Sequence, residues 1–267
     1  MTGGTGPVLR VTGLTGGFGG QSGPTLHDVT FDVQPNRITA VVGETGSGKS
    51  LTALAALRIA PRSFQVLGGT IEFDGMDLLT VSEARLRTVR GRRIGMVFQD
   101  ARTALNPVFT VGQQIADVVR VHFGVSRKAA RERTLEVLDR VRIRDPERRA
   151  GQYPHQFSGG MAQRAMIAMA LVCEPELMIL DEPTTGLDVT IQAGIMDLIL
   201  DLADSGMTAL LITHDLGVVA ETCEDVVVMR HGKVVETATA KELFTAAKHP
   251  YTQQLLAASR AVEGVVS

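Results

Sequence analysis

The sequence predicts an α/β fold in which a mixed sheet is accompanied by an antiparallel β subdomain and a helical insertion. Short, strongly apolar runs alternate with helical patterns, which indicates buried parallel strands. Near the start of the chain, other segments alternate between apolar and polar residues, which is typical of antiparallel strands. The stretch 100–156 is rich in Arg and Glu and has helical patterns without a strand-like run. It therefore predicts an inserted helical subdomain.

The composition limits the classes of function. The 267 residues are 44% apolar and 21% charged, with a formal net charge of −2. These values are ordinary for a folded globular protein, and the charge balance argues against a nucleic-acid partner. Cys173 and Cys223 form no CxxC pair, so neither a metal knuckle nor a disulfide framework is predicted. No apolar run approaches the roughly 18 residues of a membrane span. We expect any membrane role to come through a partner.

The strand predictions fall into two groups. Buried parallel strands are predicted at Ile38–Val42, Leu177–Leu180 and Thr208–Thr213. Antiparallel strands are predicted at Val8–Val11, Leu26–Val33 and Thr70–Phe73. Residues 16–24, rich in Gly, Ser, Thr and Pro, are predicted to form a loop.

One domain is expected to span residues 1–267. Its core, with the antiparallel β subdomain, would comprise 8–99 and 157–240, and a helical tail would follow at 241–267. The helical subdomain at 100–156 contains two helix-like runs, Val111–Phe123 and Arg127–Arg142.

A glycine-rich stretch carries the strongest functional signal. Gly43–Ser50 reads GETGSGKS and lies between the strand ending at Val42 and the helix-like run Leu51–Leu57. Glycines let backbone N–H groups converge on phosphate oxygens, and the helix directs its positive end to the same place. Lys49 would reach the β- and γ-phosphates, and the Ser50 hydroxyl would take a Mg²⁺ coordination position. The plainer interpretation is a glycine-rich turn that caps a helix. The candidate phosphate-binding residues are Gly43, Glu44, Thr45, Gly46, Ser47, Gly48, Lys49 and Ser50.

Two acids follow the apolar run that begins at Leu177. A buried strand that ends in Asp181 and Glu182 places both at its carboxyl end, where open α/β sheets bind ligands. Asp181 is suited to hold Mg²⁺, and Glu182 is suited to polarise an attacking water. An acid pair at this position can equally cap a helix.

Ser158-Gly159-Gly160 precedes the helical run Met161–Leu171. The serine can be a simple N-cap and the glycines a simple turn. The same arrangement can form a second anion cradle, with a hydroxyl and bare N–H groups at the start of a helix.

Taken together, these motifs resemble the ATP-binding cassette ATPases along nearly the whole chain. The resemblance implies a P-loop NTPase core that binds ATP and Mg²⁺, the metal being held through Ser50, Gln99 and Asp181. It also implies a head-to-tail dimer in which the signature Ser158-Gly159-Gly160-Met161 of one subunit closes over the γ-phosphate bound by the other. The implied catalytic residues are Lys49, Gln99, Glu182 and His214. Phe18 occupies the place of the adenine-stacking aromatic residue, and Asp188, in Gly186-Leu187-Asp188, that of the loop crossing the dimer interface.

Four further segments resemble the ATPases of oligopeptide, dipeptide and nickel importers. They are Leu105–Ile115, Tyr153–Gln156, Met161 in the signature, and His249–Leu256. The resemblance implies a second ATPase subunit, identical or not, two transmembrane permeases and an extracytoplasmic solute-binding protein. It places the chain at the cytoplasmic face of the membrane. We expect the cargo to be peptides, nickel or metal chelates. Because the sequence stops soon after His249–Leu256, without a cysteine-rich extension, no iron–sulfur site is expected, and among these cargoes nickel or a metal chelate is favoured.

Three residues depart from the family pattern. Phe157 stands in place of the commoner leucine, Ala162 in place of a basic residue and Gly186 in place of a frequent alanine. None removes a phosphate ligand. Two alternatives remain, a non-transport ATPase in a complex similar to carbon–phosphorus lyase and a catalytically quiet subunit of a heterodimer. The second is disfavoured because every expected catalytic position is filled.

Overall fold

The computed structural model describes residues 6–20 and 23–263, with side chains up to Ser259. The chain packs as two units. One draws on Met1–Leu86 and Thr208–Ser267, and the other is Arg87–Met207. By this division the predicted strand at Leu177 belongs with the helical insertion. The subdomain boundaries expected from the sequence stay a prediction, and their outermost residues, 1–5 and 264–267, lie outside the described range.

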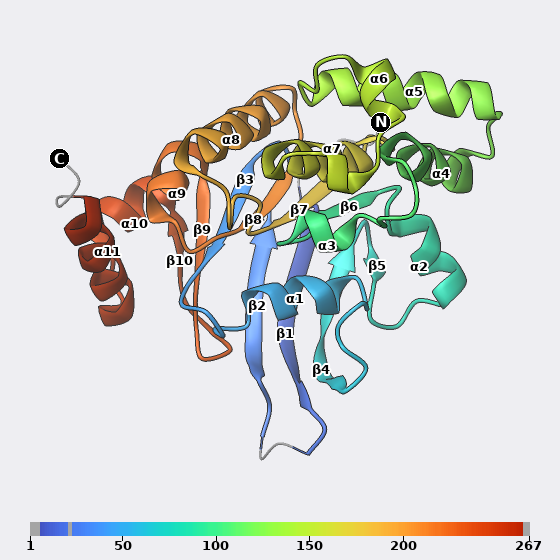
Figure 1. The fold of residues 1–267 in the computed structure, drawn as a ribbon. Helices are drawn as coiled ribbons and strands as arrows, with labels where there is room; N and C mark the ends of the chain where they lie inside the picture. Colours follow the sequence, from blue (N-terminus) through green and yellow to red (C-terminus); the bar gives the residue numbers. More distant parts are fainter. Residues whose placement is uncertain (1–5, 21–22, 264–267) are drawn as a thin grey trace. The chain divides into compact units, whose positions relative to one another are not determined.

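Two sheets form the first unit (Figure 1). The antiparallel sheet has the order β2 (Leu26–Val33), β1 (Leu9–Phe18), β4 (Phe64–Phe73) and β5 (Met76–Asp77). The mixed sheet has β10 (Lys233–Thr239) antiparallel to β9 (Asp225–Arg230), followed by β3 (Ile38–Val42) and β8 (Ala209–Ile212) in parallel. Both kinds of sheet were predicted. β3 has the predicted bounds, and its five residues, four of them apolar, are all buried.

The predicted loop at residues 16–24 is wrong at its beginning, because β1 continues to Phe18. Gly16 and Gly17 sit inside the strand for a steric reason. A Cβ atom on Gly16 would lie 2.5 Å from the ring of Phe64, and one on Gly17 would lie 3.0 Å from the Cα of Pro24. The glycines therefore allow a close approach within the sheet rather than a turn. Residues 21–22 lie outside the described range.

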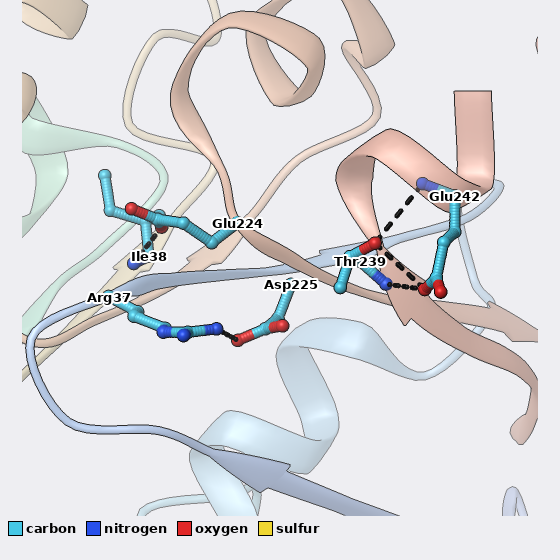
Figure 2. Close-up of polar contacts among 6 residues, drawn as sticks. All are labelled: Arg37, Ile38, Glu224, Asp225, Thr239 and Glu242. Atoms are coloured by element: carbon cyan, nitrogen blue, oxygen red, sulfur yellow. Dashed lines mark hydrogen bonds and ion pairs between the residues drawn. The ribbon is translucent and has the colours of Figure 1, made fainter. Parts of the chain in front are cut away.

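Polar contacts fasten the start of β3 to the residues that lead into β9. The Ile38 N–H donates to the Glu224 carboxylate at 2.8 Å, and the Glu224 N–H donates to the Ile38 carbonyl at 3.1 Å. Arg37 pairs with Asp225 at 3.5 Å, as Figure 2 shows. Since β3 leads directly into the glycine-rich stretch, these contacts help to set where that stretch begins.

The helices of this unit are short except for the last. They are α1 (Lys49–Ala56), α9 (Leu216–Thr222), α10 (Ala240–Ala246) and α11 (Pro250–Glu263), while α2 (Glu83–Val89) spans the boundary with the second unit. A capping box starts α10, in which the Thr239 hydroxyl accepts from the Glu242 N–H and the Glu242 carboxylate accepts from the Thr239 N–H (Figure 2).

The second unit contains one parallel strand pair and most of the helices. β6 (Ile94–Val97) pairs with β7 (Leu177–Asp181). The insertion consists of α3 (Ala101–Ala104), α4 (Val111–Phe123), α5 (Arg127–Arg140), α6 (Pro146–Ala150) and a 3₁₀ turn (Pro154–Gln156), and is followed by α7 (Gly159–Leu171) and α8 (Val189–Asp204). Helices α4, α5 and α6 pack together (Figure 1). The predicted helical insertion is thus observed, with α4 at its predicted bounds. In the described part of the chain, no helix is long and apolar enough to cross a membrane.

A carboxylate on β10 docks the C-terminal segment onto the first unit. Glu236 accepts hydrogen bonds from the backbone N–H groups of Lys248 at 2.8 Å and His249 at 3.0 Å. Burial alone would raise the pKa of Glu236, but hydrogen bonding, which includes the bonds from the Lys248 and His249 N–H groups, outweighs burial and holds the pKa below its ordinary value of 4.5. The ionised form is therefore favoured in the folded protein.

We predict that this docking contributes stability at neutral pH and loses it in acid. Because the pKa of Glu236 is lower in the folded than in the unfolded protein, its contribution is complete above the unfolded-state value and disappears as the pH falls through the folded-state value. The free energy of unfolding of Glu236→Gln should lie below that of the wild type at pH 7, and the gap should narrow towards pH 4. Glu221→Gln, in the exposed part of α9, corrects for the loss of one charge. If the difference in the free energy of unfolding stayed constant with pH, ionised Glu236 would not be the source of this stability.

Candidate functional site

The glycine-rich stretch is a tightly packed loop between β3 and α1. A Cβ atom on Gly43 would lie 2.1 Å from the Met229 carbonyl oxygen, and one on Gly48 would lie 2.6 Å from a methyl group of Leu26. Gly43, Gly46 and Gly48 all have positive φ, at 149°, 81° and 100°. Any residue with a side chain would be strained at these three positions. The loop conformation thus depends on the glycines that predicted it.

Lys49 closes this loop from the start of α1. It is 5% exposed, and its ammonium group donates to the carbonyl oxygens of Gly43 at 2.8 Å and Glu44 at 3.0 Å. The Ser47 Oγ atom is buried without a hydrogen-bond partner among the described residues, and α1 has no acidic residue in its first turn. A positive helix end, a buried ammonium group and an unsatisfied hydroxyl fit an anion, so these residues suit the phosphates of a nucleotide. If the stretch were only a turn that caps α1, the burial of the Ser47 hydroxyl without a partner would have no explanation.

His214 lies at the same end of the mixed sheet as the loop. β3 and β8 are parallel with Val41 opposite Ile212, so Gly43 and His214 each lie two residues beyond a paired position. The Thr213 N–H continues the ladder to the Val41 carbonyl at 3.2 Å. The strand pairing therefore brings the exposed imidazole to the edge from which the loop begins.

Phe18 lies at the end of β1, half-buried. Its ring packs edge-on against Phe64, with the centroids 5.4 Å apart. Gly16, two residues earlier, pairs with Leu26, the residue that lies against Gly48. The end of β1 is therefore near the loop, while stacking of Phe18 on adenine stays a prediction.

In the second unit, strand pairing brings Gln99 to Glu182. β6 and β7 are parallel with Val97 opposite Leu180, and each of the two residues lies two positions further on. The Gln99 amide nitrogen donates to the Glu182 carboxylate at 2.8 Å, and the Thr185 hydroxyl donates to the same oxygen atom at 2.9 Å. Glu182 also has a positive φ of 45°, a conformation that is costly for a residue with a side chain.

The acid pair does not cap a helix, because α8 begins after Asp188, whose carboxylate accepts from the Ile191 N–H at 3.0 Å. Asp181 is the last residue of β7 and is 6% exposed. Oxygen donors such as those of Asp181, Gln99 and Ser50 are the ligands that Mg²⁺ prefers. Asp181 and Gln99 belong to the second unit and Ser50 to the first.

The signature begins α7, and its residues have structural roles of their own. The Ser158 hydroxyl accepts from the Met161 N–H at 3.3 Å, as an N-cap. A Cβ atom on Gly160 would lie 2.5 Å from a methyl group of Ile191 on α8. Gly159 and Met161 are half-buried, and Ser158 and Asp188 are exposed. The capping interpretation is thus correct for Ser158, and the second anion cradle stays a prediction.

A cavity of about 390 Å³ joins three of the predicted motifs within the second unit. It is lined by Gln99, Asp100, Ala101, Arg102, Gly159, Gln163, Thr185, Gly186 and Leu187. The glutamine after the strand, the start of the signature and the Gly-Leu-Asp loop therefore border one space. Gln163 was not predicted as a site residue, but it is 3% exposed and its amide nitrogen has no partner among the described residues. A polar residue on the buried side of α7 is the signal that could have indicated a site residue.

The structure explains two departures from the family pattern. Ala162 is fully buried on α7, where a basic side chain would lose its hydration. Gly186 has a φ of 75°, with no atom within 4 Å of an added Cβ atom, so backbone conformation rather than space favours glycine there. Phe157 is 5% exposed and packs as a core residue.

The family comparison agrees with this geometry. The model of the family described as ABC transporter matches residues 26–185, from β2 through the acid pair to Thr185. This chain belongs to the ABC transporter family. It binds ATP, and its activity is ATP hydrolysis coupled to transport.

Several relatives of this ABC protein have names that refer to peptide transport. A peptide ABC transporter ATP-binding protein of Sinorhizobium fredii is 53% identical over 253 residues, which cover 93% of this chain and 76% of the relative. A peptide import ATP-binding protein of Brucella ovis is 50% identical over 259 residues, covering 94% and 77%.

Solved structures support the fold. An ATP-binding cassette in a dimeric, post-hydrolysis state with ADP and Pi has a TM-score of 0.76 at 25% identity, covering 87% of this chain and 98% of that one. The cbiO1 protein of Clostridium perfringens, part of the ABC transporter complex cbiONQ, has a TM-score of 0.75 at 30% identity, covering 90% and 92%.

The contact between α7 and α8 makes a prediction about the signature glycine. Gly160→Ala should lower the free energy of unfolding by about 1–3 kcal/mol, because the new methyl group collides with Ile191. The second substitution Ile191→Ala, at a residue 36% exposed, should restore most of the loss. Gly151→Ala is the matched control, since an added Cβ atom there makes an ordinary 3.5 Å contact. Urea unfolding gives the free energy of unfolding of the wild type, Gly160→Ala, the double variant and Gly151→Ala. An Ile191→Ala change that fails to rescue Gly160→Ala would contradict the steric explanation.

Proposed function

We propose that this ABC ATPase is the energy-supplying subunit of a membrane importer whose cargo is peptides. The names of the relatives at about half identity support peptide import. Peptides, nickel and metal chelates were all expected from the sequence, and the names do not specifically support the last two. They also do not favour a non-transport complex similar to carbon–phosphorus lyase. The observation that carries the catalytic part is the Gln99–Glu182 hydrogen bond of 2.8 Å.

The phosphates would be held by the loop at the start of α1. The N–H groups of Gly46–Ser50 and the positive end of the helix are suited to the β- and γ-phosphates. The Lys49 ammonium, now on carbonyl oxygens of its own loop, would exchange these for phosphate oxygens. Its burial means that the exchange replaces one set of oxygen acceptors with another and does not require a hydrated lysine to be desolvated.

Glu182 is proposed as the group that accepts a proton from the attacking water. Gln99 and Thr185 both donate to one carboxylate oxygen atom, Oε2, which orients the other oxygen atom of the group. Mg²⁺, when bound, would offset negative charge on the phosphates. Because Gln99 donates through its amide nitrogen, its amide oxygen is the atom suited to the metal. His214, at the carboxyl end of β8, is proposed to contact the γ-phosphate.

A second ATPase subunit is proposed to complete the site. Ser158–Met161 and Asp188 would face the phosphates that the partner binds, and the partner's equivalents would face Lys49. The isolated chain should then bind ATP but hydrolyse it poorly. Two permeases and an extracytoplasmic binding protein are proposed as the remaining partners, with this chain on the cytoplasmic face of the membrane.

The cargo is testable in the assembled transporter. ATP hydrolysis by the complex in proteoliposomes should rise when a mixture of short peptides is supplied with the binding protein, and labelled peptides should accumulate in the vesicles. Stimulation by nickel chelates but not by peptides would overturn the peptide assignment. Assembly without permeases would favour the non-transport alternative.

Removing the proposed base should separate ATP binding from hydrolysis. Glu182→Gln keeps the shape and an oxygen atom that can accept the bonds from Gln99 and Thr185, but its amide cannot accept the proton. The value of kcat should therefore fall about 100-fold or more, while ATP binding remains. The variant should accumulate as an ATP-bound dimer, which size-exclusion chromatography detects. Glu132→Gln, an exposed residue on α5, is the matched control. Normal turnover by Glu182→Gln would remove Glu182 from this role.

A further inference from the structure

The C-terminal segment reaches back to the phosphate-binding loop. Tyr251, the second residue of α11, is 3% exposed. The Glu44 N–H donates to its hydroxyl oxygen at 3.1 Å, across 207 positions of sequence. Both residues belong to the first unit. The loop that holds the phosphates is therefore in direct contact with the last helix of the chain.

Several contacts hold Tyr251 in place for this bond. The Arg230 guanidinium lies over its ring, 4.6 Å from the centroid. The Tyr251 N–H donates to the His249 Nδ1 atom at 3.1 Å, and the backbone N–H groups of His249 and Lys248 donate to Glu236. The turn that begins α11 is thus anchored to β10, and the ring to the end of β9.

The hydroxyl of Tyr251 remains protonated at neutral pH. Burial raises its pKa, the hydrogen bond from the Glu44 N–H lowers it, and the negative charge of the Glu44 carboxylate raises it, so that the pKa lies above the ordinary value of 10. The hydroxyl oxygen atom accepts the bond from the Glu44 N–H.

The geometry makes this bond part of the phosphate site. The Glu44 N–H and the Gly43 carbonyl belong to one planar trans peptide group, in which the two point in opposite directions. Lys49 donates to the Gly43 carbonyl at 2.8 Å, while Tyr251 accepts from the N–H of the same group. The peptide is held from both sides, and its orientation sets the place of the Lys49 ammonium. Further along the loop, the Gly232 N–H donates to the Ser47 carbonyl at 3.0 Å.

We propose that Tyr251 is a positioning residue for ATP binding, which holds the Gly43–Glu44 peptide in the orientation that the loop needs. The proposal rests on ATP binding at this loop. A loop that is ordered before binding loses less conformational entropy when the nucleotide arrives. By linkage, a contact that favours ATP binding must itself be favoured by ATP. Docking of α11 and occupancy of the nucleotide site are therefore coupled.

The test compares the full-length wild type with Tyr251→Phe. This variant keeps the ring over Arg230 and removes only the hydroxyl group. Its Kd for ATP should rise about threefold to tenfold, the value of one hydrogen bond. In the assembled transporter, KM for ATP should rise by a similar factor while kcat stays within about twofold, since Tyr251 acts before the chemical step. Tyr153→Phe, the same change at the other tyrosine of the chain, is the matched control and should leave Kd unchanged.

Amide hydrogen exchange distinguishes a positioning role of Tyr251 from a purely structural one. ATP should slow exchange of the amide hydrogens of α11 in the wild type, and this slowing should be lost in Tyr251→Phe. Glu236→Gln, which loosens the docked segment without touching the loop, should raise Kd in the same direction by a smaller factor.

The outcomes distinguish this inference from the proposed function. Wild-type protein that binds no ATP would overturn both. If the wild type and Tyr251→Phe bind ATP equally and show equal ATP-dependent protection of α11, only the positioning role of Tyr251 is overturned. A variant that is less stable by the same amount with and without ATP would also overturn it, because Tyr251 would then support the fold alone.

Discussion

Two of the parallel strand pairs in this protein bring residues of the predicted site to matching positions beyond their ends. β3 and β8 bring the start of the phosphate loop and His214 to one edge, and β6 and β7 bring Gln99 to Glu182. In both pairs the functional residues stand two positions beyond a backbone-paired residue. A shift of one residue in either register would move these side chains to the opposite face and separate them. Strand register therefore controls where these residues of the proposed site lie.

The phosphate loop is built so that few of its atoms are free to move. Gly43 has the Met229 carbonyl against it, Lys49 donates to the first two carbonyl groups of the loop, and Tyr251 holds the Glu44 N–H. Such ordering lowers the entropy lost on nucleotide binding. It also ties ATP affinity to elements at the far end of the chain, because β9 and α11 supply two of these contacts.

Several residues of the predicted site also have structural roles in the helices where they lie. Ser158 caps α7 and Asp188 caps α8, while Gly160 lets the two helices approach. A helix N-cap leaves further N–H groups of the first turn directed outward, which is the property an anion site requires. Structural and functional interpretations of such motifs are therefore compatible, and a cap at Ser158 does not argue against a role at the phosphates of a partner subunit.

Features that depend on local chemistry could be predicted from the sequence. The buried strand Ile38–Val42, the helix Val111–Phe123 and the phosphate loop follow from apolar runs, capping residues and glycine spacing within a few positions. Contacts between distant segments could not be predicted in this way. Glycine is required at position 16 because the ring of Phe64 lies against it, and at position 160 because of Ile191, while Tyr251 meets Glu44 across 207 positions. Periodicity and composition describe a residue's neighbours in sequence, whereas these three constraints arise only when the folded chain brings remote atoms together.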